Sequence, residues 1–62
     1  MPPQLYKLYD RGDLYTIYTD EYGDIEMIVY LQPDRTSIGT QVAYEDLDSR
    51  IQAKIDTLIS PL

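Results

Sequence analysis

The sequence predicts an α+β fold, an antiparallel β-meander of three to four strands with one C-terminal helix packed on one face. Runs rich in aromatic and β-branched residues fill the first half of the chain, and turn-forming residues separate them, as a meander requires. The C-terminal part instead repeats its apolar residues at helical spacing. With 62 residues in total, the chain is expected to form a single small domain over residues 1–62.

The strand-like runs are short and clearly bounded. Three strands and a weaker fourth are expected, at residues 5–9, 14–19, 25–32 and 36–43. The first connection contains Arg11-Gly12, which fits a two-residue hairpin turn because glycine tolerates positive φ. The second connection, residues 20–24, is read as a five-residue loop that contains Gly23.

These two turns determine which side chains share a face of the predicted sheet, because successive residues of a strand alternate between faces. The first turn places Tyr9 opposite Leu14, and the second places Ile17 opposite Met27. The face that results from both registers is entirely apolar and is expected to form the core. It holds Tyr6, Leu8, Tyr15, Ile17, Ile25, Met27, Val29 and Leu31.

A helix is expected over residues 48–59, capped by Asp46 or Asp48 and ended by Ser60-Pro61. Its apolar stripe should pack on the core face of the sheet, and it comprises Leu47, Ile51, Ile55, Leu58 and Ile59. The most buried side chains of the domain are expected to be Leu8, Ile17, Met27, Val29, Ile51, Ile55 and Leu58.

The opposite face of the predicted sheet carries the candidate functional residues. They form an apolar and aromatic patch that should contact a protein: Leu5, Tyr9, Leu14, Tyr18, Ile28 and Tyr30. Tyrosine is enriched at interfaces, and monomers rarely expose a contiguous patch of this kind. The alternative is that tyrosines suit strands and stabilise a small sheet through cross-strand pairs. A chain this small also gains from oligomerisation, because its own core is limited.

The composition excludes several kinds of site. The chain contains no His and no Cys, which rules out disulfides, thiol chemistry and the usual zinc ligands. No nucleophile with an adjacent base can be assembled, so we expect no enzyme activity, no catalytic residue, no cofactor and no bound metal. The acids within residues 20–26 lack the spacing of a calcium-binding EF-hand loop. Arg11-Gly12-Asp13 matches the integrin-ligand tripeptide, but a hairpin turn accounts for it.

The net charge of the chain makes some classes of binding partner unfavourable. Eleven acidic residues against five basic ones give a net charge of −6, which disfavours direct binding to nucleic acid or to an anionic membrane. No apolar run is long enough for a membrane span, and the first residues lack signal-peptide features, so we expect a cytoplasmic protein.

The leading functional hypothesis is a non-enzymatic protein-interaction module, an acidic accessory or regulatory subunit. It would bind another protein, or form a homo-oligomer, through the tyrosine-bearing face of the sheet. The alternative is an acidic inhibitor whose carboxylates mimic nucleic-acid phosphates and so occupy a nucleic-acid-binding protein. The two hypotheses differ in the surface that acts and in how strongly salt should weaken the complex.

Overall fold

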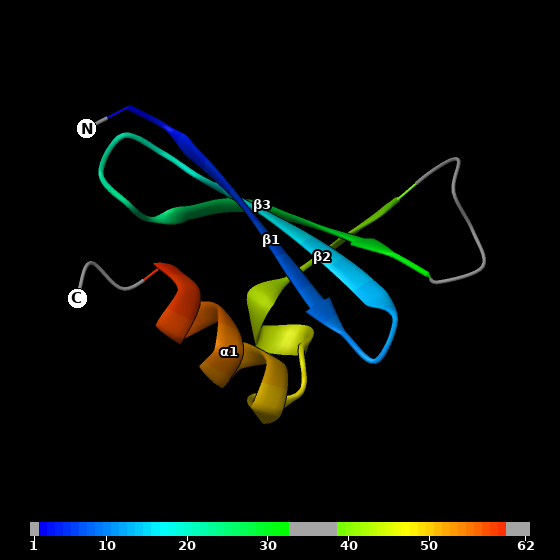
Figure 1. Ribbon diagram of the computed structural model, residues 1–62. Coiled ribbons are helices and arrows are strands. Elements are labelled where there is room, and N and C mark those ends of the chain that lie inside the picture. The colour runs from blue at the N-terminus through cyan, green and yellow to red at the C-terminus, as the bar shows by residue number, and fades with distance from the viewer. Residues whose placement is uncertain (1, 33–38, 60–62) are drawn as a thin grey trace.

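The computed structural model describes residues 2–32 and 39–59 and confirms the α+β meander. A four-stranded antiparallel sheet has the order β1-β2-β3-β4, with strands β1 (Gln4–Asp10), β2 (Asp13–Thr19), β3 (Ile25–Leu31) and β4 (Thr40–Val42). A short 3₁₀ helix, η1 (Tyr44–Asp46), and the helix α1 (Ser49–Ile59) follow. Both helices lie on one side of the sheet, and no element of the described residues covers the other side (Figure 1).

The observed elements differ from the expected ones mainly near β4 and η1. The structure places only Thr40–Val42 in the fourth strand, and residues 36–38 of the expected strand lie outside the described residues. η1 was not anticipated from the sequence. α1 begins one residue later than expected, and the Asp48 carbonyl accepts a hydrogen bond from the Gln52 N–H at 2.9 Å, as at a helix start. Within the described residues, neither helix has the length and apolar character that a membrane crossing requires.

The hairpin of β1 and β2 has the register that the sequence predicts. Tyr9 lies opposite Leu14, across a two-residue turn. Arg11 and Gly12 both have positive φ, at 54° and 87°. This is the turn geometry that matches the twist of the flanking strands. It accounts for Arg11-Gly12-Asp13 as a structural turn.

The pairing of β2 with β3 departs from the prediction through a β-bulge. Thr19 lies opposite Ile25 as the five-residue loop requires, but Tyr18 lies opposite Met27. Glu26 is therefore an extra residue in β3 that has no partner in β2. A bulge of this kind shifts the register of everything that follows it.

The shift exchanges the two faces of β3 beyond the bulge. The expectation that Met27, Val29 and Leu31 face the core is therefore wrong. The placement of Ile28 and Tyr30 on the opposite face is wrong for the same reason, and Ile28 is in fact 1% exposed. The physical cause is that apolar residues occupy both alternating sets of positions in β3. The sequence therefore does not show which set faces solvent, and the two registers cannot be told apart.

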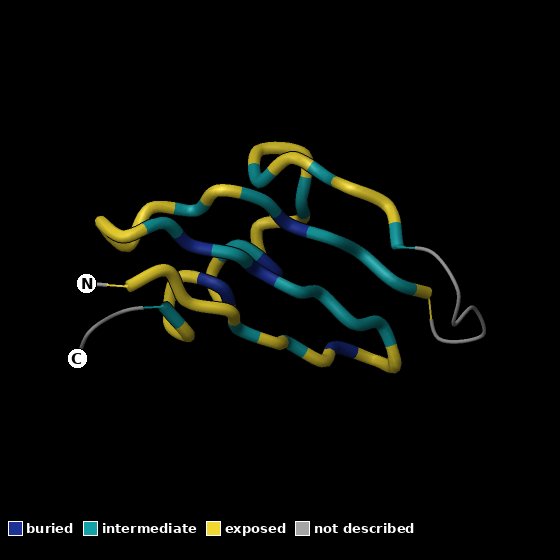
Figure 2. The backbone as a smooth tube through the Cα atoms, turned by 90° about the horizontal axis from the view of Figure 1, so that it is seen from above, coloured by how far each residue is buried: buried dark blue, intermediate teal, exposed yellow. Residues whose placement is uncertain are grey.

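The core lies between α1 and the inner face of the sheet, which is the face that α1 covers. Its fully buried members are Ile17, Ile28, Ile51 and Ile55. Partly buried side chains pack around them: Tyr6, Leu8, Tyr15, Ile25, Val42, Tyr44, Leu47 and Ile59. Figure 2 shows buried segments on the central strands β2 and β3 and on α1, whereas the edge strand β1 is exposed or half-buried except at Asp10.

The predicted core is confirmed for Ile17, Ile51 and Ile55, and it is wrong for Leu58. Leu58 is 37% exposed. The buried residues of α1 are Ile51 and Ile55, four positions apart, and Leu58 lies to one side of the line that they form on the helix surface. Leu8 is only half-buried, since it lies on the edge strand β1 and lacks a neighbouring strand on one side.

Candidate functional site

The outer face of the sheet, the side away from α1, is an uncovered apolar surface. Its apolar members are Leu5, Tyr9, Leu14, Tyr18, Met27, Val29 and Leu31, as the strand registers place them. The structure thus brings together Leu5, Tyr9, Leu14 and Tyr18 of the predicted interface. Ile28 and Tyr30 are missing from this face because the bulge turns them inward, and their neighbours in β3 take the outer positions.

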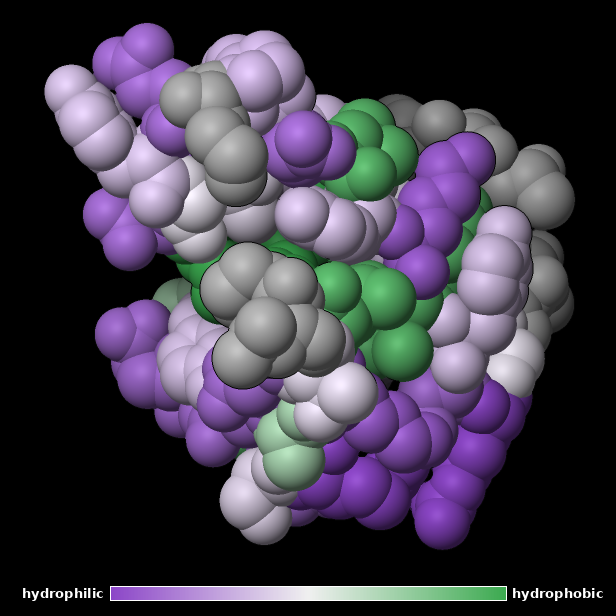
Figure 3. Space-filling view, turned by 60° about the vertical axis from the view of Figure 1, so that its left-hand side comes forward, coloured by the Kyte–Doolittle hydropathy of each residue, from purple (hydrophilic) through white to green (hydrophobic). Residues whose placement is uncertain are grey.

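Water reaches this outer face in the isolated chain. Tyr9 is 68% exposed and Leu5 is 51% exposed, both on the edge strand β1. The members from β2 and β3 are half-buried against their lateral neighbours. Figure 3 shows strongly hydrophilic side chains gathered over the helical side of the molecule and hydrophobic surface mainly at the level between α1 and the sheet.

The outer face carries almost no net charge. Among the charged strand residues, Lys7 and Glu26 lie on this face, whereas Asp10 and Asp13 lie on the inner one. The chain as a whole has a net charge of −6, so its acids are concentrated elsewhere, in loops and helices. A nearly neutral apolar face on an acidic chain is typical of an interface core, which is depleted in charge.

A second polar feature lies on the inner face, at the turn end of β1. Asp10 is only 6% exposed, and its carboxylate is bound by two cations of α1. Arg50 Nη1 donates to both carboxylate oxygens at 2.7 Å, and Lys54 Nζ donates to Oδ1 at 2.6 Å. The hydrogen bond from Lys54, followed by that from Arg50, lowers the pKa of Asp10 from 3.8 to about 2.

This ion-pair cluster ties β1 to α1 and is unsuited to acid–base catalysis. A general acid or base must exchange its proton near neutral pH, whereas a carboxyl group with a pKa of about 2 stays ionised there. The cluster also explains how Asp10 can lie opposite Asp13, because two cations compensate the first and the Tyr30 hydroxyl donates to Asp13 Oδ1 at 3.1 Å. No pattern in the sequence indicates it, since Asp10 lies 40 and 44 residues from its partners.

Tyr30, which was expected at the interface, belongs to this inner polar region. Its ring packs against that of Tyr15, with centroids 5.2 Å apart and an interplanar angle of 38°. Burial, together with the negative charge of Asp13, raises the pKa of Tyr15. The pair joins β2 to β3 and leaves neither ring on the outer face.

The acidic loop at residues 20–24 is built as a turn. Asp20 Oδ1 accepts hydrogen bonds from the backbone N–H groups of Tyr22 at 2.9 Å and Asp24 at 3.0 Å. Gly23 has a φ of 87°, which favours glycine at this position. The carboxylate of Asp20 is thus engaged by its own loop. Within residues 2–32 and 39–59, no group of three or more acidic side chains is arranged to hold a metal ion.

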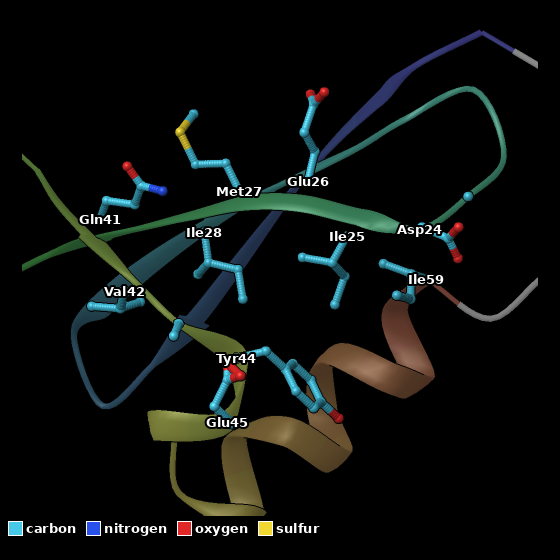
Figure 4. Close-up of a pocket in the computed structure, with 12 residues that line it drawn as sticks. Asp24, Ile25, Glu26, Met27, Ile28, Gln41, Val42, Tyr44, Glu45 and Ile59 are labelled. Atoms are coloured by element: carbon cyan, nitrogen blue, oxygen red, sulfur yellow. The ribbon is translucent and has the colours of Figure 1, made fainter.

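A third feature, here termed the edge slot, opens where β3 extends beyond the end of β4. The slot encloses about 510 Å³, and its apolar walls are Ile25, Ile28, Val42, Tyr44 and Ile59. Figure 4 shows the two β3 isoleucines pointing toward the layer formed by η1 and α1. Acidic residues Asp24, Glu26 and Glu45 also line it. Sequence reasoning missed this slot because it depends on the early end of β4 and on the bulge.

Of the three features, the outer face carries the exposed Leu5 and Tyr9, whereas the Asp10 cluster connects β1 to α1. Comparison with known proteins finds no significant match for the chain among family models, curated proteins or solved structures.

Proposed function

We propose that the protein is a non-enzymatic interaction module, a small acidic accessory or regulatory subunit, whose outer face binds a second copy of the chain. The observation that supports the proposal is the bare apolar face of the sheet, with Tyr9 68% and Leu5 51% exposed. Contiguous apolar surface on a small protein marks a site of contact, since leaving it in water is costly.

The charge distribution favours a second copy as the occupant. Each chain carries a net charge of −6, yet its outer face holds one cation and one anion, Lys7 and Glu26. Two copies that meet through this face keep most of their other acids on loops and helices or on the inner face, away from the contact, and water and salt screen the repulsion. A two-fold arrangement also sets the same apolar patch against itself, as closed dimers require.

The dimensions of the molecule suit such a dimer. It measures 34 × 23 × 18 Å, and a standard interface takes roughly 800 Å² of surface from each partner, so a dimer of that kind would use most of one broad side of the molecule. The described core contains four fully buried isoleucines, which is little for an independent domain. Covering the outer face would add a second apolar layer to this small core.

A pair of matched tyrosine substitutions tests the proposal. Tyr18 lies on the outer face, whereas Tyr22 lies in the 20–24 loop and is 81% exposed. In sedimentation velocity over a concentration series, the wild type and Tyr22→Glu should form dimers, and Tyr18→Glu should be a folded monomer. Circular dichroism provides the check on folding. A wild type that sediments as a monomer at every concentration contradicts the proposal.

An acidic inhibitor that mimics nucleic-acid phosphates is the second candidate function. The observation that favours it is a group of exposed acids in η1 and just before α1, Glu45, Asp46 and Asp48, which lies apart from the outer face. A basic nucleic-acid-binding protein held by these acids should dissociate as salt is raised. Its binding should also be weakened by Asp46→Asn and unaffected by Tyr18→Glu, which separates this function from the first.

A further inference from the structure

The edge slot points to a second binding site, centred on the side of the sheet that faces α1. We propose that it accepts a short extended segment of a partner protein, in which apolar and basic side chains alternate, by strand addition to β3. The proposal does not depend on the dimer described above, and its site shares Glu26 and Met27 with the outer face.

The backbone of β3 is open beside the slot. β4 pairs with Ile28, Val29 and Tyr30, and the chain then leaves the sheet at Ala43 to form η1. In the described part of the chain, no strand lies beside residues 25–27 on that side. Open strand edges of this kind recruit extended chains, because main-chain hydrogen bonds complete the ladder.

The apolar walls of the slot determine which kind of side chain an added segment could point toward α1. Ile25 and Ile28 extend from β3 toward Tyr44 and Ile59, and the space between them is open at the sheet edge (Figure 4). The volume of about 510 Å³ lies within the range of ligand pockets. A side chain that points toward α1 from an added strand would enter this space. An apolar residue fits best there, since Ile25, Ile28 and Ile59 surround this inward part of the slot (Figure 4).

The acidic residues of the slot determine which side chains could stand next to that apolar residue in the added segment. The lining includes the carboxylates of Asp24, Glu26 and Glu45 and contains no Lys or Arg. Glu26 points to the opposite side of β3 from Ile28 (Figure 4), because the bulge places it on the outer side. Successive residues of an added strand also point to opposite sides. A basic residue next to the apolar one would therefore lie on the side of Glu26, which gives the alternating pattern.

The wall opposite β3 is held in place by hydrogen bonds. The Tyr44 hydroxyl donates to Asp56 Oδ1 at 2.8 Å, and Gln52 Nε2 donates to the Tyr44 carbonyl at 2.9 Å. The bond to Asp56 raises the pKa of Tyr44. These contacts fasten η1 to α1, so the slot is formed before a segment arrives and little ordering is needed on binding.

An NMR titration with designed peptides tests the site. The probe is a short peptide of alternating lysine and valine, and the controls are its glutamate–valine counterpart and an N-methylated form that cannot pair as a strand. The probe should shift the backbone amide signals of residues 25–27, and both control peptides should leave them unchanged. The double variant Glu26→Gln/Glu45→Gln should raise the Kd about tenfold. Glu21→Gln/Asp46→Asn, an equal change of charge at two residues outside the slot lining, should leave the Kd for the probe unchanged.

Three results would overturn the proposal. One is the absence of amide shifts at millimolar probe and low salt. Another is binding that the N-methylated peptide reproduces, since strand pairing would then play no part. The third is an equal loss of affinity in Glu21→Gln/Asp46→Asn and in the slot variant, which would show general attraction to an acidic chain.

Discussion

The two faces of the sheet carry similar apolar side chains in very different surroundings. The inner face is covered by α1, and its centre contains the fully buried Ile17 and Ile28. The outer face presents tyrosine, leucine, valine and methionine with no described element over them, and Tyr9 is 68% exposed. Because β3 supplies apolar residues to both faces, side-chain type alone does not determine burial here. The bulge and the covering helix determine it, and no element of the described residues covers the outer face.

The largest expected effect lies on the inner face. Ile55 is 0% exposed at the centre of the contact between α1 and the sheet. Ile55→Ala should lower the free energy of unfolding by about 2–5 kcal/mol, through lost burial and the cavity left behind. Denaturant unfolding followed by circular dichroism measures the change, and Leu5→Ala on the outer face is the control. Equal midpoints for Ile55→Ala and the wild type would contradict the packing of α1.

A smaller loss is expected where β4 joins the sheet. A Cβ atom at Gly39 would clash with Val29 Cγ1 and lie 3.4 Å from the Tyr30 carbonyl oxygen. Gly39→Ala should therefore cost about 1–3 kcal/mol, as overpacking does. The double variant Gly39→Ala/Val29→Ala removes the clashing methyl group and should recover part of the loss. Thermal unfolding of the three proteins decides the matter, and a single variant as stable as the wild type would contradict this close approach.

The ion-pair cluster of the inner face should make the free energy of unfolding depend on pH. The pKa of Asp10 falls from 3.8 to about 2 on folding, so its contribution to stability is complete above about pH 4. It is lost as the pH falls from about 4 to about 2, because the carboxylate is protonated and releases Arg50 and Lys54. Asp10→Asn should lack this part of the pH dependence. The exposed Asp46→Asn is the control, and an identical acid slope in wild type and Asp10→Asn would contradict the cluster.

The smallest effect on folding is expected on the outer face. Tyr9→Ser, made in the monomeric Tyr18→Glu background, should change the free energy of unfolding by no more than about 0.5 kcal/mol, as exposed substitutions do. This background removes the concentration dependence that a dimer would add. Denaturant unfolding provides the measurement. A loss comparable with that of Ile55→Ala would mean that the two faces do not differ as described.

The two hairpins show which strand registers can be predicted from the sequence and which cannot. The register of β1 and β2 follows from the two-residue turn at Arg11-Gly12, and the structure confirms it. The five-residue loop correctly places Thr19 opposite Ile25, but nothing in the sequence predicts that Glu26 bulges out one residue later. If β3 were polar at alternate positions, the predicted register would have buried those polar side chains, and the error in the register would have been visible in the sequence.

The candidate surfaces show the same limit. Leu5, Tyr9, Leu14 and Tyr18 lie on β1 and β2, so the sequence could place them on one face correctly. The β3 members of the patch could not be placed, because their positions depend on the bulge. The Asp10 cluster and the edge slot depend on contacts between segments distant in the chain, which local patterns do not encode.

The most direct test of the outer face as a dimer interface is an isotope-filtered NOE measurement on a mixture of labelled and unlabelled protein. The proposal predicts intermolecular NOEs that connect the methyl groups of Leu14, Met27 and Val29 with outer-face protons of the second copy. Intermolecular NOEs confined to α1, or their complete absence at concentrations where the wild type sediments as a dimer, would contradict it.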